Sequence, residues 1–154
     1  MAQQTLVAGS RQMYGTSAKI RSRFTMVDEN FTEVYGGDRT AGTVTATADG
    51  LTTGLIDADD GFVTVTSANA GHQISLPAAN VGKILVIKVG TTGCELISSV
   101  AADKVNNVVV GATNEAALTA NNTYVLIYVA ASIWIMTGYT NLGAVQTAVV
   151  PDAA

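Results

Sequence analysis

The chain has 154 residues, a formal net charge of −4 and a pI near 4.7. Only 13 % of the residues are charged, about half the usual share for a soluble domain, whereas 48 % are hydrophobic. The acidic balance argues against nucleic acid as the principal partner, because phosphate binding needs a basic face. So few charges leave much of the surface uncharged. We therefore expect the chain to bury surface against copies of itself or a host assembly.

The single cysteine, Cys94, excludes an intrachain disulfide and a multi-cysteine metal site. It lies in an apolar strand pattern, so we expect a buried, unreactive thiol. The first residues lack the charged and then apolar run of a secretion signal. The longest apolar stretch, residues 124–136, is well short of the roughly 20 residues that cross a bilayer as a helix. No membrane association is expected.

Residues 1–40 follow neither the helical period nor the strand period, and they scatter isolated large side chains among small polar ones. The only charges from residue 9 to 27 are basic, whereas residues 41–154 hold three Lys against eight Asp or Glu. This contrast predicts an extended basic arm over residues 1–40 and an acidic domain over 41–154. In the alternative interpretation, short strands at 23–27 and 31–35 simply add edge strands to the same domain.

Residues 41–154 contain a succession of short strands rich in β-branched and aromatic residues, separated by Gly, Asn and Asp. They repeat every 10 to 15 residues without helical segments, which predicts an all-β antiparallel sandwich or small barrel, with jelly-roll-like connections as one form. Gly90 to Gly93 is expected to close a hairpin, Ala130-Ala131 to reverse the chain, and Pro77 to end a strand. The expected strands span residues 43–48, 62–66, 72–76, 83–89, 94–99, 105–110, 116–118, 123–129 and 132–137.

Residues able to do chemistry are scarce. His72 is the only histidine, so a Ser-His-Asp or Cys-His device would depend on it, but its position beside a Gly turn favours a structural role. Asp57, Asp59 and Asp60 resemble part of a calcium loop without its full ligand set, and solvated turn acids are the simpler interpretation. No phosphate loop, cofactor motif or metal-ligand pattern is present. The sequence therefore predicts a protein without enzymatic activity, cofactor or metal.

Four aromatic residues, Tyr124, Tyr128, Trp134 and Tyr139, fall on neighbouring expected strands. They could stack on sugar rings as a carbohydrate-binding platform. Packing in the core or between subunits is the commoner use of such side chains.

The stretch from Gly61 to Ala78, with "VTVT" and "ISLPA" strands, followed by "VGKILVIK" at 81–88, resembles small virion proteins of tailed bacteriophages. These include head decoration proteins and fibre-associated modules. The similarity covers about residues 43–137, and its motifs are mostly strand and turn chemistry. The resemblance implies a non-enzymatic structural role in a virus particle, commonly as a trimer that grips the capsid through an extended terminal segment.

From this resemblance we expect a homotrimeric capsid decoration protein on the exterior of the virion, with the major capsid protein as its partner. A tail-fibre or adhesin-type module, or a carbohydrate-binding domain, is the alternative. The chain lacks the repetitive shaft that would hold a fibre head away from the particle. The expected capsid-binding residues of the arm are Arg11, Tyr14, Lys19, Arg21, Arg23, Phe24, Phe31 and Tyr35.

Overall fold

The computed structural model describes residues 40–111 and 113–153. These residues form strands joined by turns and loops, with no helix among them. The arm expected over residues 1–40 lies outside the described residues apart from Thr40. The strands are β1 (Thr40–Thr45), β2 (Asp60–Thr66), β3 (Gln73–Leu76), β4 (Ile84–Val89), β5 (Cys94–Ser98), β6 (Lys104–Val105), β7 (Val108–Val109), β8 (Asn114–Leu118), β9 (Thr123–Ala130), β10 (Ile133–Tyr139) and β11 (Asp152–Ala153).

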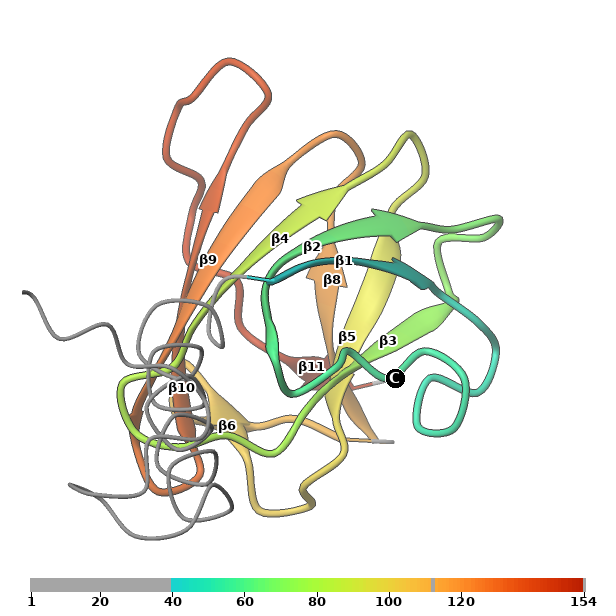
Figure 1. Ribbon diagram of the computed structural model, residues 1–154. Coiled ribbons are helices and arrows are strands. Elements are labelled where there is room, and N and C mark those ends of the chain that lie inside the picture. Colours follow the sequence, from blue (N-terminus) through green and yellow to red (C-terminus); the bar gives the residue numbers. More distant parts are fainter. Residues whose placement is uncertain (1–39, 112, 154) are drawn as a thin grey trace, which may run out of the picture. The chain divides into compact units, whose positions relative to one another are not determined.

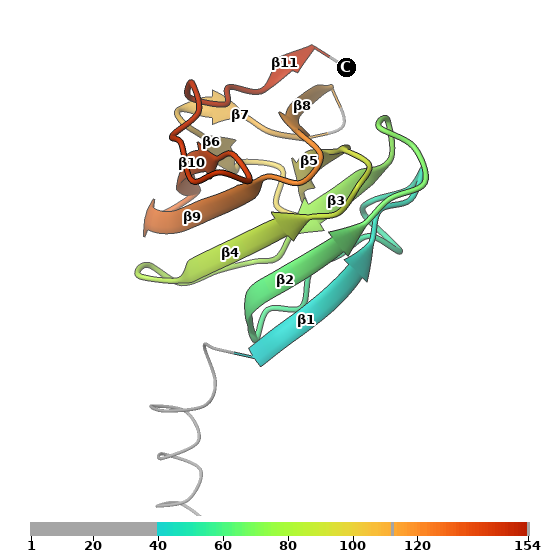
Figure 2. The same cartoon turned by 90° about the horizontal axis from the view of Figure 1, so that it is seen from above.

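Two mixed sheets face each other, consistent with a β-sandwich (Figure 1). The large sheet has seven strands in the order β1-β2-β4-β9-β10-β6-β7, and the small sheet has four in the order β11-β8-β5-β3. Seen from above, β1, β2, β4 and β9 form one layer in front of β3 and β5 (Figure 2). The prediction of an all-β fold is confirmed.

The first half of the domain winds as a coil. β1 pairs in parallel with β2, and β2 in parallel with β4, so that Val44 lies beside Val65 and Val65 beside Val89. In the small sheet β3 runs parallel to β5, and Leu55 makes an isolated parallel bridge to Ser75. Each turn of this coil spans roughly 20 residues and adds one strand or bridge to each of the two sheets, as in solenoid proteins.

The expected antiparallel arrangement is wrong for this half of the chain, and so are jelly-roll connections and the hairpin at Gly90 to Gly93. β4 and β5 belong to different sheets, because the glycine-rich segment crosses between the layers instead of reversing within one. The N–H of Gly90 donates to the carbonyl of Val65, and a Cβ on Gly90 would lie 2.8 Å from that oxygen. The glycine is thus needed for a close approach of two backbones.

The second half is mainly antiparallel. β9 pairs with β4 on one side and with β10 on the other, and β8 pairs with β5. The chain reverses at Ala131-Ser132, one residue later than the expected Ala130-Ala131, with Ser132 in the left-handed region at φ 59°. β3 ends at Leu76, immediately before Pro77, as expected.

One expected strand, residues 105–110, is in fact a small hairpin of β6 and β7. Asn106 and Asn107 both have positive φ, 50° and 70°, which is the backbone of a type I′ turn. Asparagine tolerates this conformation better than other residues with a side chain, so the Asn-Asn pair was the signal for this turn.

Side chains that point alternately inward and outward along the strands of the large sheet build the core. Every second residue of β2, β4, β9 and β10 points toward the small sheet, where Trp134 and Tyr124 are the largest fully buried side chains. The remaining residues of these strands point outward from the large sheet. The core cluster draws on residues 44 to 136, so both halves of the described domain share one core.

Candidate functional site

The eight arm residues expected to bind the capsid, Arg11 through Tyr35, lie outside the described residues. Their role stays a prediction. The candidate sites below therefore come from residues 40–111 and 113–153.

The histidine and cysteine both have structural surroundings. His72 is half-buried, and its Nδ1 lies 3.2 Å from the carbonyl oxygen of Ala46. Cys94 is buried, and burial, with a smaller contribution from Glu95, raises the pKa of its thiol to about 12. A thiol with this pKa stays protonated at neutral pH, and only the thiolate is a nucleophile. The expectation of a buried thiol is confirmed.

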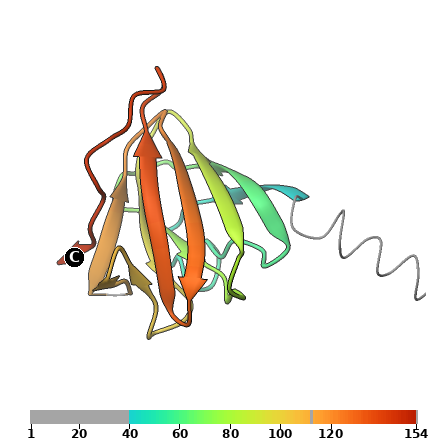
Figure 3. The same cartoon turned by 90° about the vertical axis from the view of Figure 1, so that its left-hand side faces the viewer.

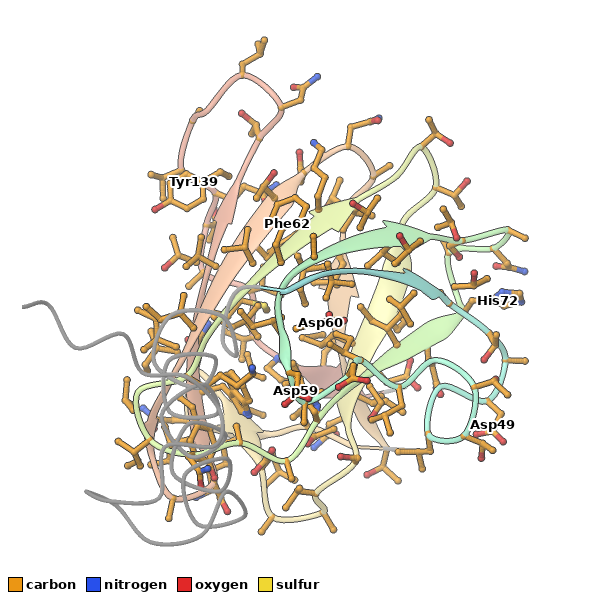
Figure 4. The ribbon with its side chains drawn as sticks, in the orientation of Figure 1. Asp49, Asp59, Asp60, Phe62, His72 and Tyr139 are labelled. Carbon is orange, nitrogen blue, oxygen red and sulfur yellow. The ribbon has the colours of Figure 1, made fainter. Side chains whose placement is uncertain are left out.

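The three clustered aspartates are turn residues. Asp57 Oδ1 accepts the backbone N–H of Asp59 at 3.0 Å, and both side chains are exposed. Asp60 is half-buried, and burial followed by the charge of Asp57 raises the pKa of its carboxyl group. No group of three or more potential metal ligands occurs in the described part of the chain. Figure 4 shows that Asp49 lies well apart from Asp59 and Asp60.

Three of the four aromatic residues are core residues, so the suggested sugar-stacking platform is wrong for them. Tyr124, Tyr128 and Trp134 are buried, and only Tyr139 is partly exposed. The hydroxyls of Tyr124 and Tyr128 each accept a backbone N–H of a neighbouring turn. The rings of Tyr128 and Trp134 meet edge to face with centroids 4.9 Å apart.

The outward face of the large sheet is the most unusual surface of the domain. Figure 3 looks toward β10, β9, β4 and β2 side by side. Two cross-strand rows of apolar side chains run over these strands: Phe62 pairs with Val86 and Val86 with Val125, and Ile84 pairs with Ile127 and Ile127 with Ile135. These six residues are called here the apolar outer face.

Four residues of the apolar outer face are substantially exposed in the described part of the chain. Ile84 is 52 % exposed, Phe62 and Ile135 are each 40 % exposed, and Ile127 is 39 % exposed. Figure 4 places Phe62 and Tyr139 over the large sheet, away from His72 and Asp49. A monomeric protein rarely leaves so many neighbouring β-branched and aromatic side chains in water, so this face is a candidate interaction surface.

Charged side chains stand only at the margins of that face in the described residues. Asp60 starts β2, Lys88 lies near the end of β4, and Lys104 lies on β6 beside Ile133. The ammonium of Lys88 donates to the carbonyl of Asn121, a residue in the turn before β9. A ring of mixed charges and threonines around an apolar centre resembles the rim and core of a protein interface.

The outward face of the small sheet has the opposite character. Glu95, Glu115 and Asp152 come from neighbouring strands β5, β8 and β11, and we call them the acidic outer face. Gln73 Nε2 donates to Glu115 Oε1. Partial burial, then the charges of Glu115 and Asp152, raise the pKa of Glu95. The domain thus has one apolar and one acidic face.

The chain matches no model of a known protein family, and no curated protein is significantly similar to it. Over the described range, the structure contains no helix of the length and apolar character that a membrane span requires. The resemblance to virion proteins therefore stays a prediction.

Proposed function

We propose that the protein is a non-enzymatic structural component of a tailed-phage particle. It is a decoration protein that forms a homotrimer on the capsid exterior and holds the major capsid protein through its N-terminal arm. The observation that carries the proposal is the apolar outer face, because contiguous exposed apolar patches are often protein interaction sites. The scarcity of charged residues in the whole chain supports the same conclusion.

The N-terminal arm is the segment that binds the capsid in this proposal. Arg11, Lys19, Arg21 and Arg23 are the only charges from residue 9 to 27, and they can meet acidic patches on a capsid lattice. The large side chains between them, such as Phe24, can fill grooves between capsid subunits. Three arms on one trimer bind multivalently, so that modest affinity of each arm still gives slow release.

Binding of this kind stabilises the shell by mass action. A ligand that binds the assembled shell and not its separated subunits shifts the equilibrium toward assembly. No chemical step is required, which agrees with the structural surroundings of His72 and Cys94.

A tail-fibre or adhesin-type module is the second candidate, and the coil formed by β1 to β5 favours it. A coil of parallel strands can be lengthened by adding further turns, which is how elongated solenoids are built. A carbohydrate-binding domain receives less support, since Trp134 is buried and only Tyr139 offers a partly exposed ring.

Deletion of residues 1–35 tests the proposal. The truncated protein should remain a folded oligomer and should no longer sediment with purified capsids, while the full chain does. A matched control is Asp59→Ala, which changes an exposed turn residue of the domain and should still bind. Unchanged capsid affinity of the 36–154 protein would show that the arm is not the binding element.

A further inference from the structure

The apolar outer face continues across four strands without a break. In register, Phe62, Val86 and Val125 form one row, and Ile84, Ile127 and Ile135 form the next. From their exposed fractions, these side chains leave on the order of 400 Å² of apolar surface in water. This area lies within the range of the largest apolar patch on a typical monomer, and such a patch is often functional.

The threonines on neighbouring positions extend this surface. Thr43 pairs with Thr64, while Thr123 pairs with Lys88 and with Tyr139, so a third row of mostly uncharged residues borders the apolar ones. The rim enlarges the surface that a partner could cover, and a standard interface buries roughly 800 Å² per partner. The composition, apolar in the centre and polar at the rim, also agrees with such interfaces.

The charge pattern allows two copies of this chain to meet through the apolar outer face. Two copies that met through their acidic outer faces would bring Glu95, Glu115 and Asp152 close to the same residues of the other copy, which like-charge repulsion opposes. Two copies that meet through their apolar outer faces bring no like charges together in the centre. Asp60 and Lys88, at the margins, supply both signs of charge for pairing with a neighbouring copy.

We infer that the apolar outer face is the contact between subunits, and that it packs against the same face of other copies of this chain. In the proposed trimer the three faces meet around the three-fold axis, so each contact joins two different parts of the face. Ile127 lies at the centre of its row, between Ile84 and Ile135, and is the residue on which the contact depends most. The inference rests on the self-association in the proposed function and is independent of capsid binding.

The test compares full-length variants by sedimentation velocity at equal concentration. Ile127→Asp places a carboxylate in the centre of the face, where a free surface would leave it hydrated and a subunit contact would bury it. We expect the wild-type protein to sediment as an oligomer and Ile127→Asp as a monomer. The matched control is Leu142→Asp in the loop after β10, which is 91 % exposed and should keep the wild-type mass.

A second variant keeps the test valid if the Ile127→Asp protein does not fold. Ile127→Thr keeps a β-branched residue in β9 and adds no charge, so the monomer should retain its circular dichroism spectrum. We expect its subunit dissociation constant to rise at least 10-fold over the wild type. An Ile127→Asp or Ile127→Thr protein that keeps the wild-type mass and dissociation constant would overturn the inference.

The remaining outcomes also decide the matter. A monomeric wild-type protein would overturn the inference and would leave residues 1–39 or a capsid protein as the cover of the face. A wild-type oligomer that Ile127→Asp dissociates supports the inference even if neither protein binds capsids, in which case only the proposed function fails.

Discussion

Asp103→Ala removes a carboxylate that connects the core to the loop before β6. Asp103 is buried, and its Oδ2 accepts a hydrogen bond from Ser98 Oγ at 2.8 Å and another from Trp134 Nε1 at 3.2 Å. The serine oxygen in turn accepts the backbone N–H of Val100. The substitution leaves the indole N–H and the serine hydroxyl without this acceptor inside the core.

A buried donor left unpaired costs about 1 to 3 kcal/mol. Two such donors give about 4 kcal/mol. Removal of Asp103 Oδ1 offsets part of this, because that buried oxygen has no hydrogen-bond partner among the described residues. We expect a net loss of about 3 kcal/mol in the free energy of unfolding, or about 10 °C in melting temperature.

Trp134 is the only tryptophan, so its fluorescence reports unfolding in urea or on heating directly. The control is Asp59→Ala, because Asp59 is an exposed turn residue. A loss below about 1 kcal/mol for Asp103→Ala, or a loss equal to that of the control, would refute the reasoning that the carboxylate satisfies two buried donors.

Three further predictions concern charge and reactivity. Burial and two neighbouring carboxylates raise the pKa of Glu95, so the folded state holds its proton more tightly than the unfolded state, and stability falls as pH rises through and above its ordinary pKa of 4.5. Glu95→Gln should therefore raise the melting temperature at pH 7 and leave it nearly unchanged at pH 3; equal effects at both would contradict this. Cys94 should react with a thiol reagent only after unfolding, and rapid native labelling would contradict its burial. Replacing Arg11, Arg21 and Arg23 by Ala should weaken capsid binding less as salt rises; a salt-independent loss would exclude the electrostatic contribution.

Much of the strand content could be predicted from local pattern. The alternation in β2, β4, β9 and β10 is visible in the sequence because one face of each strand is buried and the other is not. The end of β3 before Pro77 follows from backbone chemistry that acts within a few residues, because proline cannot donate to a ladder.

The coil could not be predicted in the same way. Whether two neighbouring strands in sequence pair or cross to opposite sheets depends on contacts between distant residues, such as Val44 with Val65 and Val65 with Val89. The Gly90 to Gly93 segment has the composition of a hairpin turn and of a crossing alike, so composition alone favoured the wrong topology. The Asn106-Asn107 turn was a local signal that could have been read.

The sequence predicted that the domain associates with a partner, but not which residues form the apolar outer face. Low charge predicted association, but Ile84, Ile127 and Ile135 became one row only through the pairing of three strands, β4, β9 and β10. The same pairing sends Trp134 inward, since it alternates with Ile133 and Ile135, which point outward.

The position of the protein on intact phage particles tests the proposed function most directly. Gold-labelled antibody against residues 41–154, viewed by electron microscopy, should decorate the head over its whole surface, with hundreds of copies on each particle. Label confined to the tail or to a single vertex would contradict capsid decoration and would favour the fibre module. Particles without any label would contradict a place in the virion altogether.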